Sequence, residues 1–380
     1  MPSDPPALRP PLSFYAPLKS PDDPVPSGDR TVARLLLAAL ERAGLAPKLA
    51  SRFRSFSGDG TAQNALLAAG ADEAERVYGA LEPLPEARRP RLWLTYHSYY
   101  KAPDLIGPVV SRRLAIPYVL VEASHADKRA GGPFDLFHRR AADAVRAADL
   151  HLVLNRRDEE GLRRLRGGGN GIVRLAPFVG ETGPSDPAPL SENGPLRLVT
   201  VAMMRPGDKF SSYRILADAL GRAPCDWVLD VAGDGAARGE VEAAFAPLAE
   251  RVRFHGLVTE PDRLAALVRE ADLLAWPGVN EAFGMTYLEA ARYGRPALAM
   301  RYGGVPEVVE DGVSGLLVDA GDADAYALAL EHLALDRARL RRLGAGARER
   351  SESVHGFDAA ARRLSQTLAP LLSRSPVCAS

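Results

Sequence analysis

Short apolar runs rich in β-branched residues alternate with helical patterns along most of this chain, which limits the folds it can adopt. In the first half, helical stretches such as 31–44 and 138–149 separate the apolar runs. The predicted strands of this half are 92–96, 118–122, 150–154 and 172–176. Runs this apolar are typical of parallel strands covered on both faces. The pattern therefore predicts an α/β protein built from βαβ units.

The alternation stops once, between residues 177 and 195. The segment PFVGETGPSDPAPLSENGP contains five prolines and no periodic apolar pattern, as is typical of an interdomain linker. Six further strands are predicted beyond it, with helices such as 241–252 and 261–272: 196–202, 227–233, 252–256, 272–276, 296–300 and 315–319. Since 380 residues exceed what one core usually supports, we expect two doubly wound parallel-sheet domains.

Composition narrows the class of protein. Lys and Arg together number 48, and so do Asp and Glu, which argues against a partner among nucleic acids. The N-terminus lacks a basic start followed by an apolar core, and no stretch approaches the roughly 18 apolar residues of a membrane span. We therefore expect a cytoplasmic protein. Cys225 and Cys378 stand alone, so neither a disulfide framework nor a zinc site is predicted.

Ligands of doubly wound sheets bind at the carboxyl ends of the strands, so functional side chains are expected there. MMRPGDKF follows the predicted strand 196–202 and contains Arg205 and Lys209. Two cations four positions apart could clamp a diphosphate, although a solvated charged turn is an equally good reading. Lys209 is the only lysine in the second half of an arginine-rich chain, which favours a specific role.

The turn GDGAARGE follows the predicted strand 227–233. Its glycines, Gly233 and Gly235, match only part of a dinucleotide-binding fingerprint, because alanine stands where the third glycine would fall. We therefore favour a tight turn with a close backbone approach at this position.

Residues 280–289 read NEAFGMTYLE, with Glu281 and Glu289 on either side of a predicted helix start at Gly284. Eight helical residues span about 12 Å, which is too far for an acid and a base that act on one atom. Free N–H groups at a helix start bind anions, so a bound phosphate would lie between the two glutamates. A nucleoside diphosphate sugar has this layout. The alternative is that neither glutamate binds a ligand: one would interact with the dipole at the helix N-terminus, and the other would be exposed to solvent.

Together these segments resemble the donor domain of retaining glycosyltransferases of family 4, also called glycosyl transferases group 1, between about Leu196 and Asp319. The matching segments are RPGDK, VAGDG, VRFHGLV, EAFGMTYLE and GGVPEVVEDGVSGLLVDAGD. The resemblance implies a GT-B fold, in which two Rossmann-like domains face each other across a cleft. It predicts boundaries at 1–178 for an acceptor-binding domain, 179–195 for a linker and 196–355 for the donor domain. A C-terminal helix in 356–380 is expected to cross back to the first domain.

The resemblance also implies the activity. The enzyme would move a sugar, expected to be a hexose, from a nucleotide-diphosphate-sugar donor to a glycan, lipid-linked or small-molecule acceptor, with retention and without a metal or cofactor. The alternatives are a nucleotide-sugar 2-epimerase or sugar phosphorylase of the same fold, or a non-catalytic nucleotide-sugar-binding subunit. The donor base, the sugar, the acceptor, any peripheral membrane contact and the oligomeric state stay open.

The matching motif implies roles for single residues. Glu289 is expected on the ribose, the two cations on the diphosphate and Glu281 beside the transferred sugar. The predicted catalytic residues are His125, Glu281, Arg205 and Lys209. The predicted donor-binding residues are Gly28, Arg205, Lys209, Gly233, Phe283, Gly284, Met285, Thr286 and Glu289. Two departures, Met204 in place of a glycine and an arginine-to-lysine spacing one residue shorter than usual, affect the expected phosphate geometry.

The first half resembles the family only loosely. Gly28 precedes the first predicted helix, where these enzymes have a glycine-rich loop, although an ordinary Ser/Asp helix cap explains VPSGDR as well. His125 follows a strand where the family has a catalytic histidine. His97, with its aromatic neighbours, is predicted to line the acceptor pocket instead. The acceptor-binding candidates are His97, Tyr99, Tyr100 and Lys101.

Overall fold

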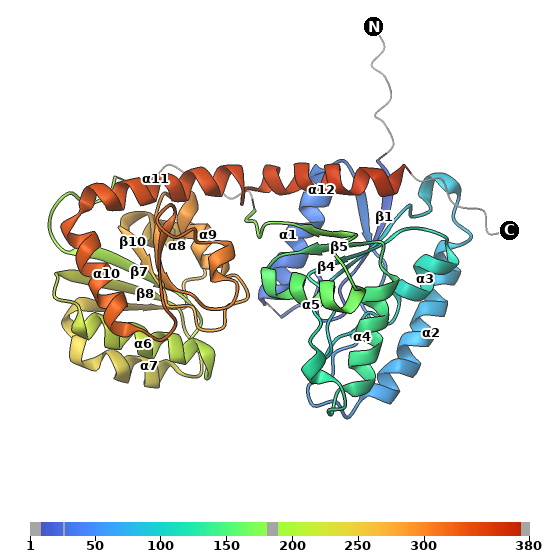
Figure 1. The fold of residues 1–380 in the computed structure, drawn as a ribbon, viewed down its shortest axis with the longest axis horizontal. Coiled ribbons are helices and arrows are strands. Elements are labelled where there is room, and N and C mark those ends of the chain that lie inside the picture. Colours follow the sequence, from blue (N-terminus) through green and yellow to red (C-terminus); the bar gives the residue numbers. More distant parts are fainter. Residues whose placement is uncertain (1–8, 26, 181–188, 374–380) are drawn as a thin grey trace, which may run out of the picture. The chain divides into compact units, whose positions relative to one another are not determined.

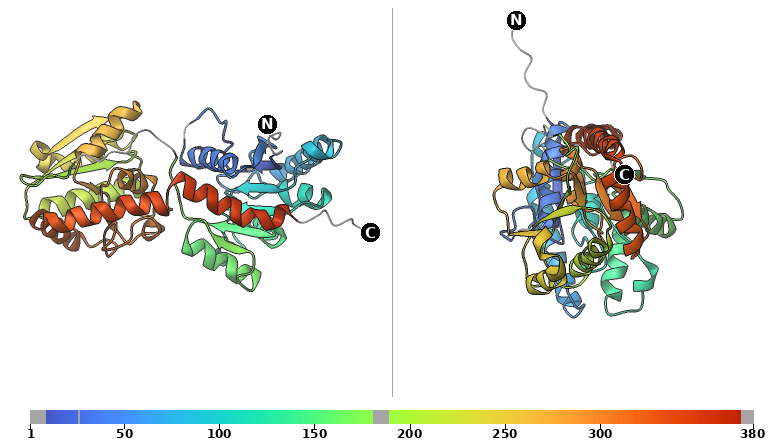
Figure 2. Two further views of the ribbon diagram at one scale, coloured as in Figure 1. Left: turned by 90° about the horizontal axis from the view of Figure 1, so that it is seen from above. Right: turned by 90° about the vertical axis from the view of Figure 1, so that its left-hand side faces the viewer.

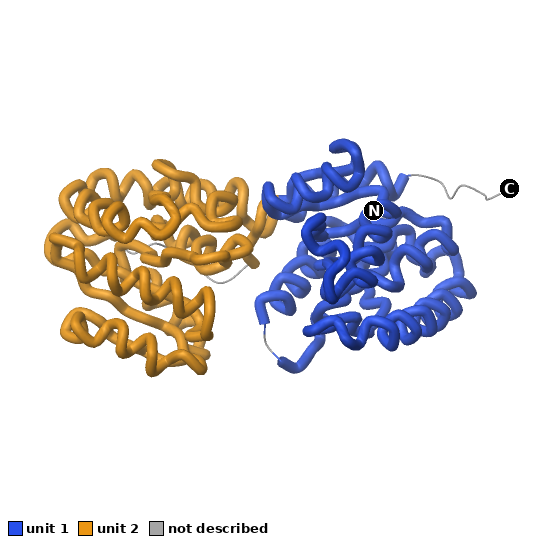
Figure 3. Tube along the Cα trace, turned by 60° about the horizontal axis from the view of Figure 1, so that its bottom comes forward, with its two compact units in different colours: residues 1–175, 360–380 blue, residues 176–359 orange. Residues whose placement is uncertain are grey.

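The computed structural model describes residues 9–25, 27–180 and 189–373, and its chain divides into two compact units (Figures 1 and 3). Unit 1 comprises the described residues within 1–175 and 360–380, and unit 2 those within 176–359. Each unit contains one six-stranded sheet in which every pairing is parallel. The predicted α/β class with two parallel-sheet domains is confirmed. Part of the predicted linker, residues 181–188, lies outside the described residues.

The sheet of unit 1 has the strand order β2-β1-β3-β4-β5-β6. Its strands are β1 (Pro11–Tyr15), β2 (Ala46–Leu49), β3 (Trp93–Tyr96), β4 (Tyr118–Val121), β5 (Leu150–Val153) and β6 (Ile172–Arg174). The helices that connect them are α1 (Gly28–Arg42), α2 (Gln63–Leu81), α3 (Gly107–Arg113), α4 (Asp135–Ala147) and α5 (Arg156–Arg166), with the short η1 (Glu86–Arg88) and η2 (Asp127–Arg129). Parallel crossovers are right-handed, so α2 to α5 lie on the opposite face from α1 (Figures 1 and 2).

The sheet of unit 2 has the order β12-β11-β10-β7-β8-β9. Its strands are β7 (Leu196–Val201), β8 (Trp227–Ala232), β9 (Val252–Gly256), β10 (Leu273–Ala275), β11 (Ala297–Met300) and β12 (Gly315–Val318). Its helices are α6 (Asp208–Arg222), α7 (Arg238–Phe245), α8 (Pro261–Glu270), α9 (Met285–Arg292), α10 (Ala323–Leu335) and α11 (Arg337–Ser353), with η3 (Ala246–Arg251) and η4 (Val305–Glu307). In Figure 1, α6 and α7 cover one face of this sheet, and α8 and α9 cover the other.

Helix α12 (Phe357–Leu372) follows α11, and its residues from 360 onward belong to unit 1. Its apolar side, which includes Ala360, Leu364 and Leu368, is buried. The guanidinium of Arg91 donates a hydrogen bond of 2.8 Å to the carbonyl of Leu372, which ties the helix end to the start of β3. Among the described residues, no helix combines the length and the apolar character that crossing a bilayer requires.

All ten predicted strands are present, but the sequence analysis missed β1 and β2. Each contains a proline, Pro11 or Pro47, and β2 is an edge strand with no fully buried residue. Prolines are tolerated at strand starts and sheet edges, where they obscure the sequence pattern. The predicted helix 241–252 was also partly wrong: α7 ends at Phe245, and η3 continues as a 3₁₀ helix whose second residue is Pro247.

Candidate functional site

The carboxyl ends of the parallel strands bring distant polar residues together at one point of each sheet. In unit 1 the chain leaves β1 toward β2 and leaves β3 in the opposite direction, and in unit 2 the same reversal occurs between β7 and β10. Doubly wound sheets bind their ligands at such a reversal. Each reversal is spanned by a pair of ionisable side chains: Asp29 with His97 in unit 1, and Lys209 with Glu281 in unit 2.

The Lys209–Glu281 pair joins the start of α6 to the loop between β10 and α9. The ammonium of Lys209 donates to Glu281 Oε1, which also accepts a hydrogen bond of 3.1 Å from the indole of Trp276. The same ammonium lies 5.5 Å from the centroid of the Trp276 ring. The Lys209 side chain is 31% exposed, and an ammonium has three donors, so this group can also reach an anionic ligand.

The start of α9 leaves its first N–H groups open. Gly284 occupies the N-cap position with a φ of 79°, and no side chain caps the helix. The N–H groups at Met285 and Thr286 therefore face a potential anion, while Phe283 is buried just before them. Four predicted donor-binding residues, Phe283 to Thr286, thus form the uncapped start of α9 and the residue before it.

Tyr287 explains two glycines of this loop. A Cβ atom on Gly284 would lie 2.6 Å from the Tyr287 ring, and one on Gly278 would lie 2.3 Å from its hydroxyl. That hydroxyl donates a hydrogen bond of 2.9 Å to the carbonyl of Trp276. Tyr287 therefore holds the helix start against the end of β10, and only glycine fits on either side of it.

A second glycine pair, Gly303 and Gly304, packs against the backbone of the loop between β10 and α9. The N–H of Gly304 donates a hydrogen bond of 2.9 Å to the carbonyl of Glu281. A Cβ atom on Gly304 would lie 1.6 Å from the carbonyl oxygen of Ala282, and one on Gly303 would lie 2.3 Å from that of Glu281. The GGVPE segment that follows β11 therefore fixes the backbone that carries Glu281.

The other predicted residues of unit 2 differ in their access to a ligand. Arg205 follows β7, is exposed and has no ion-pair partner among the described residues. Met204 beside it is buried, and its N–H donates a hydrogen bond of 2.9 Å to the carbonyl of Asp234. At this departure from the family pattern, Met204 has a buried side chain, and its backbone N–H joins the segments that follow β7 and β8.

Gly233 has a packing role that the sequence analysis favoured. Its N–H donates to the carbonyl of Gly256 at 2.8 Å, so this group is already used within the protein. A Cβ atom on Gly233 would lie 1.8 Å from the carbonyl oxygen of Ala202. Its predicted contact with the donor stays a prediction.

Glu289 lies on α9, four residues after its first residue, and its side chain is exposed to solvent. Four helical residues cover about 6 Å along the axis, so Glu289 stands about one turn from the open helix start. The protein around it nevertheless raises the pKa of its carboxyl group through desolvation. Its contact with a ribose stays a prediction.

In unit 1, Asp29 in the first turn of α1 contacts His97 directly after β3, with 2.9 Å between Oδ1 and Nδ1. Burial by itself would lower the pKa of His97, but the hydrogen bond to Asp29 and nearby carboxylates outweigh it and raise the pKa. Ser27 caps α1 by accepting a hydrogen bond of 3.2 Å from the N–H of Arg30. A Cβ atom on Gly28 would meet nothing within 4 Å, so there is open space beside it.

The predicted acceptor-binding residues form one aromatic series. His97 lies 5.1 Å from the ring of Tyr99, which lies 5.4 Å from that of Tyr100. Tyr100 in turn lies 5.3 Å from Phe134, and the ammonium of Lys101 lies 5.1 Å from the Phe134 ring. Burial raises the pKa of Tyr99 to about 12, so its hydroxyl stays protonated at neutral pH.

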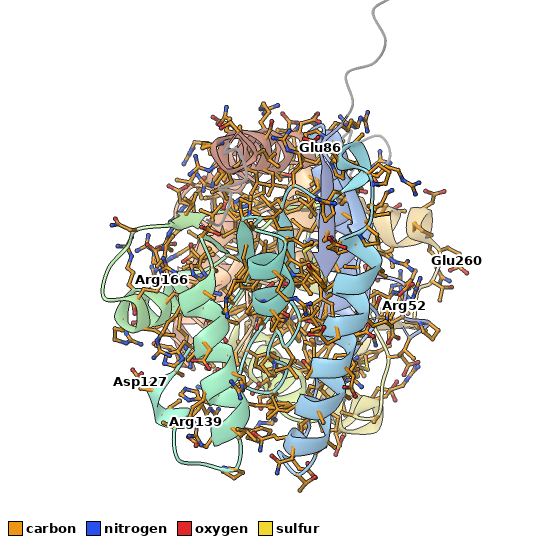
Figure 4. The ribbon with its side chains drawn as sticks, turned by 90° about the vertical axis from the view of Figure 1, so that its right-hand side faces the viewer. Arg52, Glu86, Asp127, Arg139, Arg166 and Glu260 are labelled. Atoms are coloured by element: carbon orange, nitrogen blue, oxygen red, sulfur yellow. The ribbon has the colours of Figure 1, made fainter. Side chains whose placement is uncertain are left out.

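His125, the predicted catalytic histidine, is packed inside unit 1. Its side chain is 5% exposed, stacks on His138 with 4.7 Å between ring centroids, and lies 3.1 Å from an oxygen of Asp127. Asp127 itself lies at the periphery of the molecule (Figure 4). Burial lowers the pKa of His125. Its catalytic role stays a prediction, and the structure brings His97 rather than His125 to the strand reversal of unit 1.

Three charged residues near these pairs escaped the sequence analysis: Asp29, Glu122 and Asp158. Glu122 follows β4 and is 8% exposed, and Asp158 lies in the first turn of α5. Glu122 could have been found from the sequence, because it is a charged residue directly after an apolar run. Such a position lies at the ligand-binding edge of a parallel sheet. Asp29 fell within the helix-cap interpretation of VPSGDR, and Asp158 lies on a helix that the sequence analysis did not name. Among the described residues, no group of three or more His, Cys, Asp or Glu could hold a metal ion.

Comparison with known proteins gives a family match within unit 2. The model of the family described as Glycosyl transferases group 1 matches residues 196–336. The D-inositol 3-phosphate glycosyltransferase of Xylanimonas cellulosilytica is 38% identical over 167 residues, which are 43% of this chain and 40% of that protein. Its counterpart in Corynebacterium kroppenstedtii is 37% identical over 116 residues, 30% of this chain and 26% of that protein. The chain thus aligns with well under two thirds of these relatives' length.

Solved structures confirm the fold over almost the whole chain. The Anabaena protein Alr3699/HepE, solved in complex with UDP, gives a TM-score of 0.69 at 18% identity and covers 94% of this chain and 99% of its own. The sucrose-phosphate synthase of Thermosynechococcus elongatus gives 0.71 at 20% identity and covers 97% and 100%. The predicted GT-B fold class, with two Rossmann-like parallel-sheet domains, is confirmed.

Proposed function

Because the model of the glycosyl transferases group 1 family matches residues 196–336, we propose that the protein is a retaining glycosyltransferase that uses a nucleotide-diphosphate sugar. The observation that carries this proposal is the Lys209–Glu281 pair at the strand reversal of unit 2, beside the uncapped start of α9. A cation and a helix N-terminus that converge on one point suit a diphosphate. UDP is the first nucleotide to test, since the Anabaena neighbour was solved with UDP and with UDP-glucose.

In the proposed reaction, the bond between the sugar C1 and the diphosphate oxygen breaks, and a bond from an acceptor hydroxyl oxygen to C1 forms on the same face. The proton of the acceptor hydroxyl passes to the departing diphosphate. Lys209, Arg205 and the N–H groups at the start of α9 stabilise the charge that develops on this leaving group, which supports catalysis without a metal. Glu281 Oε1 already accepts two hydrogen bonds, so its proposed role is to orient Lys209 and a sugar hydroxyl.

A binding experiment tests the donor site. Lys209→Ala removes a charge-assisted hydrogen bond worth about 1.5–3 kcal/mol, so it should weaken UDP binding roughly 10- to 100-fold in calorimetry. Arg214→Ala is the matched control, because Arg214 is an exposed cation on the same helix α6. The donor-site assignment fails if Lys209→Ala binds UDP as tightly as the control does.

Product analysis separates the proposed activity from its alternatives. NMR of the slow hydrolysis of a bound donor should show free sugar released first with the donor's anomeric configuration, and EDTA should leave the rate unchanged. Interconversion of donors would indicate an epimerase, and phosphate-dependent cleavage of a glycoside would indicate a phosphorylase. Binding without any turnover would indicate a binding subunit. A cytoplasmic location and peripheral membrane contact stay predictions.

A further inference from the structure

Four polar side chains stand at the carboxyl ends of four neighbouring strands of unit 1. Asp29 lies on α1 beyond β1, His97 follows β3, Glu122 follows β4 and Asp158 lies on α5 beyond β5. We call these four residues the strand-end cluster. These residues lie close enough for their charges to interact, since the charge of His97 acts to lower the pKa of both Glu122 and Asp158. The cluster belongs to unit 1 alone.

The strand-end cluster has a surplus of negative charge. Its one basic group is His97, whose closest contact is with Asp29, so Glu122 and Asp158 lack a cation of their own within the cluster. Two outer cations also act on it: Lys19 on Asp29 and Arg157 on Asp158. Lys19 is itself paired with Asp23 at 3.5 Å, so the surplus of carboxyl groups remains.

Glu122 shows that the cluster is incomplete. Its side chain is more than nine-tenths buried, and its Oε2 atom has no hydrogen-bond partner. Burial raises the pKa of this carboxyl group, while the charge of His97 partly opposes the shift. The hydroxyl of Tyr96 acts on the same carboxyl group as a hydrogen-bond donor and helps to lower its pKa, yet Oε2 stays without a partner. Two other nearby donors are already used, because His97 Nδ1 contacts Asp29 and the amide of Asn155 donates to Asp158 at 2.7 Å. A buried polar atom without a partner is costly, so a donor from a ligand would stabilise this site.

Aromatic rings border the same point. The ring of His97 lies 5.7 Å from Tyr96 and 5.1 Å from Tyr99, and the series continues to Tyr100. Aromatic faces pack against the apolar faces of sugar and cyclitol rings, while buried carboxylates accept hydrogen bonds from hydroxyl and ammonium groups. The surroundings of Glu122 therefore suit a ring that carries hydrogen-bond donors.

We propose that the strand-end cluster binds the acceptor, and that this acceptor is an unphosphorylated polyol carrying a protonated amine. This rests on the proposed glycosyltransferase function. An ammonium brings three donors and a positive charge to Glu122 and Asp158, whereas a hydroxyl brings one donor and no charge. A phosphate would meet like charges at the same place. The acceptor class would then differ from the inositol phosphate in the names of the two relatives.

Three matched ligands test the proposal on the full-length protein: myo-inositol, an aminodeoxyinositol and an inositol monophosphate, titrated by calorimetry at pH 7 with and without saturating UDP. The aminodeoxyinositol should bind at least tenfold more tightly than myo-inositol, and the monophosphate should bind most weakly. Equal binding of the amine and the neutral cyclitol, tighter binding of the phosphate, or no binding of the amine in either condition would overturn the proposal.

Variants locate the binding. Glu122→Gln should weaken the amine at least tenfold and leave UDP affinity unchanged, because UDP is assigned to unit 2. Glu160→Gln makes the same chemical change on the exposed side of α5 and should bind the amine like the parent protein. Asp158→Asn gives the same test if Glu122→Gln does not fold. Amine binding that survives in both cluster variants would overturn the proposal, whereas loss of UDP binding by the parent protein would count against the donor site only.

Discussion

At the residue scale, the histidines differ according to what surrounds each ring. His97 contacts a carboxylate, whereas His151 is fully buried, with its Nε2 atom 3.0 Å from the carbonyl oxygen of Val145 and 3.2 Å from Nη1 of Arg166. Burial and the arginine charge lower the pKa of His151 to about 4. The same residue type therefore titrates on opposite sides of its ordinary value of about 6.5 within one unit.

NMR titration of the imidazole groups should show this division. We expect His97 to titrate above pH 6.5 and His151 near pH 4. Asp29→Asn should bring the pKa of His97 down, because it removes the hydrogen-bonded carboxylate. A pKa for His97 that does not move in this variant would contradict the assigned contact.

The same pair sets a pH window for stability. Burial by itself would raise the pKa of Asp29, but its hydrogen bonds and the charges of His97 and Lys19 together outweigh burial and lower it. The contribution of Asp29 is therefore lost as pH falls below about 4. The raised pKa of His97 means that its contribution is present below about pH 6.5 and is lost as pH rises through the folded-state pKa. The pair therefore contributes most to the stability of unit 1 between these limits.

At the element scale, the loop between β10 and α9 depends on glycines supplied by two different segments. Gly278 and Gly284 make room for Tyr287, and Gly304 supports the loop from the turn after β11. The position of Glu281 is therefore set by backbone packing before any ligand binds. This agrees with a site in which the first groups to contact a donor are held rigidly.

Gly304→Ala should disturb this loop. The added Cβ atom would lie 1.6 Å from a backbone oxygen, so the loop must shift, at a cost of about 1–3 kcal/mol or more. Denaturant unfolding should detect the lost stability, and calorimetry should detect weaker UDP binding. Gly239→Ala is the control, since a Cβ atom there meets nothing within 4 Å in helix α7 and should leave stability unchanged or raise it by up to about 1 kcal/mol. Similar behaviour of the two variants would argue against the packing account.

At the scale of the whole molecule, each unit has its own six-stranded sheet, its own strand reversal and its own pair of ionisable side chains. The effect of a ligand that binds one unit should therefore be measurable separately from any effect on the other unit. A ligand at 100 times its Kd stabilises the state that binds it by about 2.7 kcal/mol.

Hydrogen exchange in the presence of UDP should report this separation. We expect the largest protection in unit 2, around the end of β7 and the start of α9, with smaller changes in the strands of unit 1. Uridine, which lacks the diphosphate, should protect the start of α9 far less. Equal protection of both sheets by UDP would place the nucleotide site elsewhere.

The sequence alone determined the α/β class, ten of the twelve strands and the motif around Glu281 and Glu289, because these depend on apolar periodicity and on local helix-start chemistry. The interpretation of Gly233 as a close-packed turn was equally local. Only the tertiary structure decided which residues meet. Lys209 and Glu281 are 72 residues apart, and Asp29 and His97 are 68 apart, and parallel strand order brings each pair together. Likewise, four strand ends converge near Glu122, whose buried Oε2 atom has no hydrogen-bond partner, and no local pattern encodes that convergence.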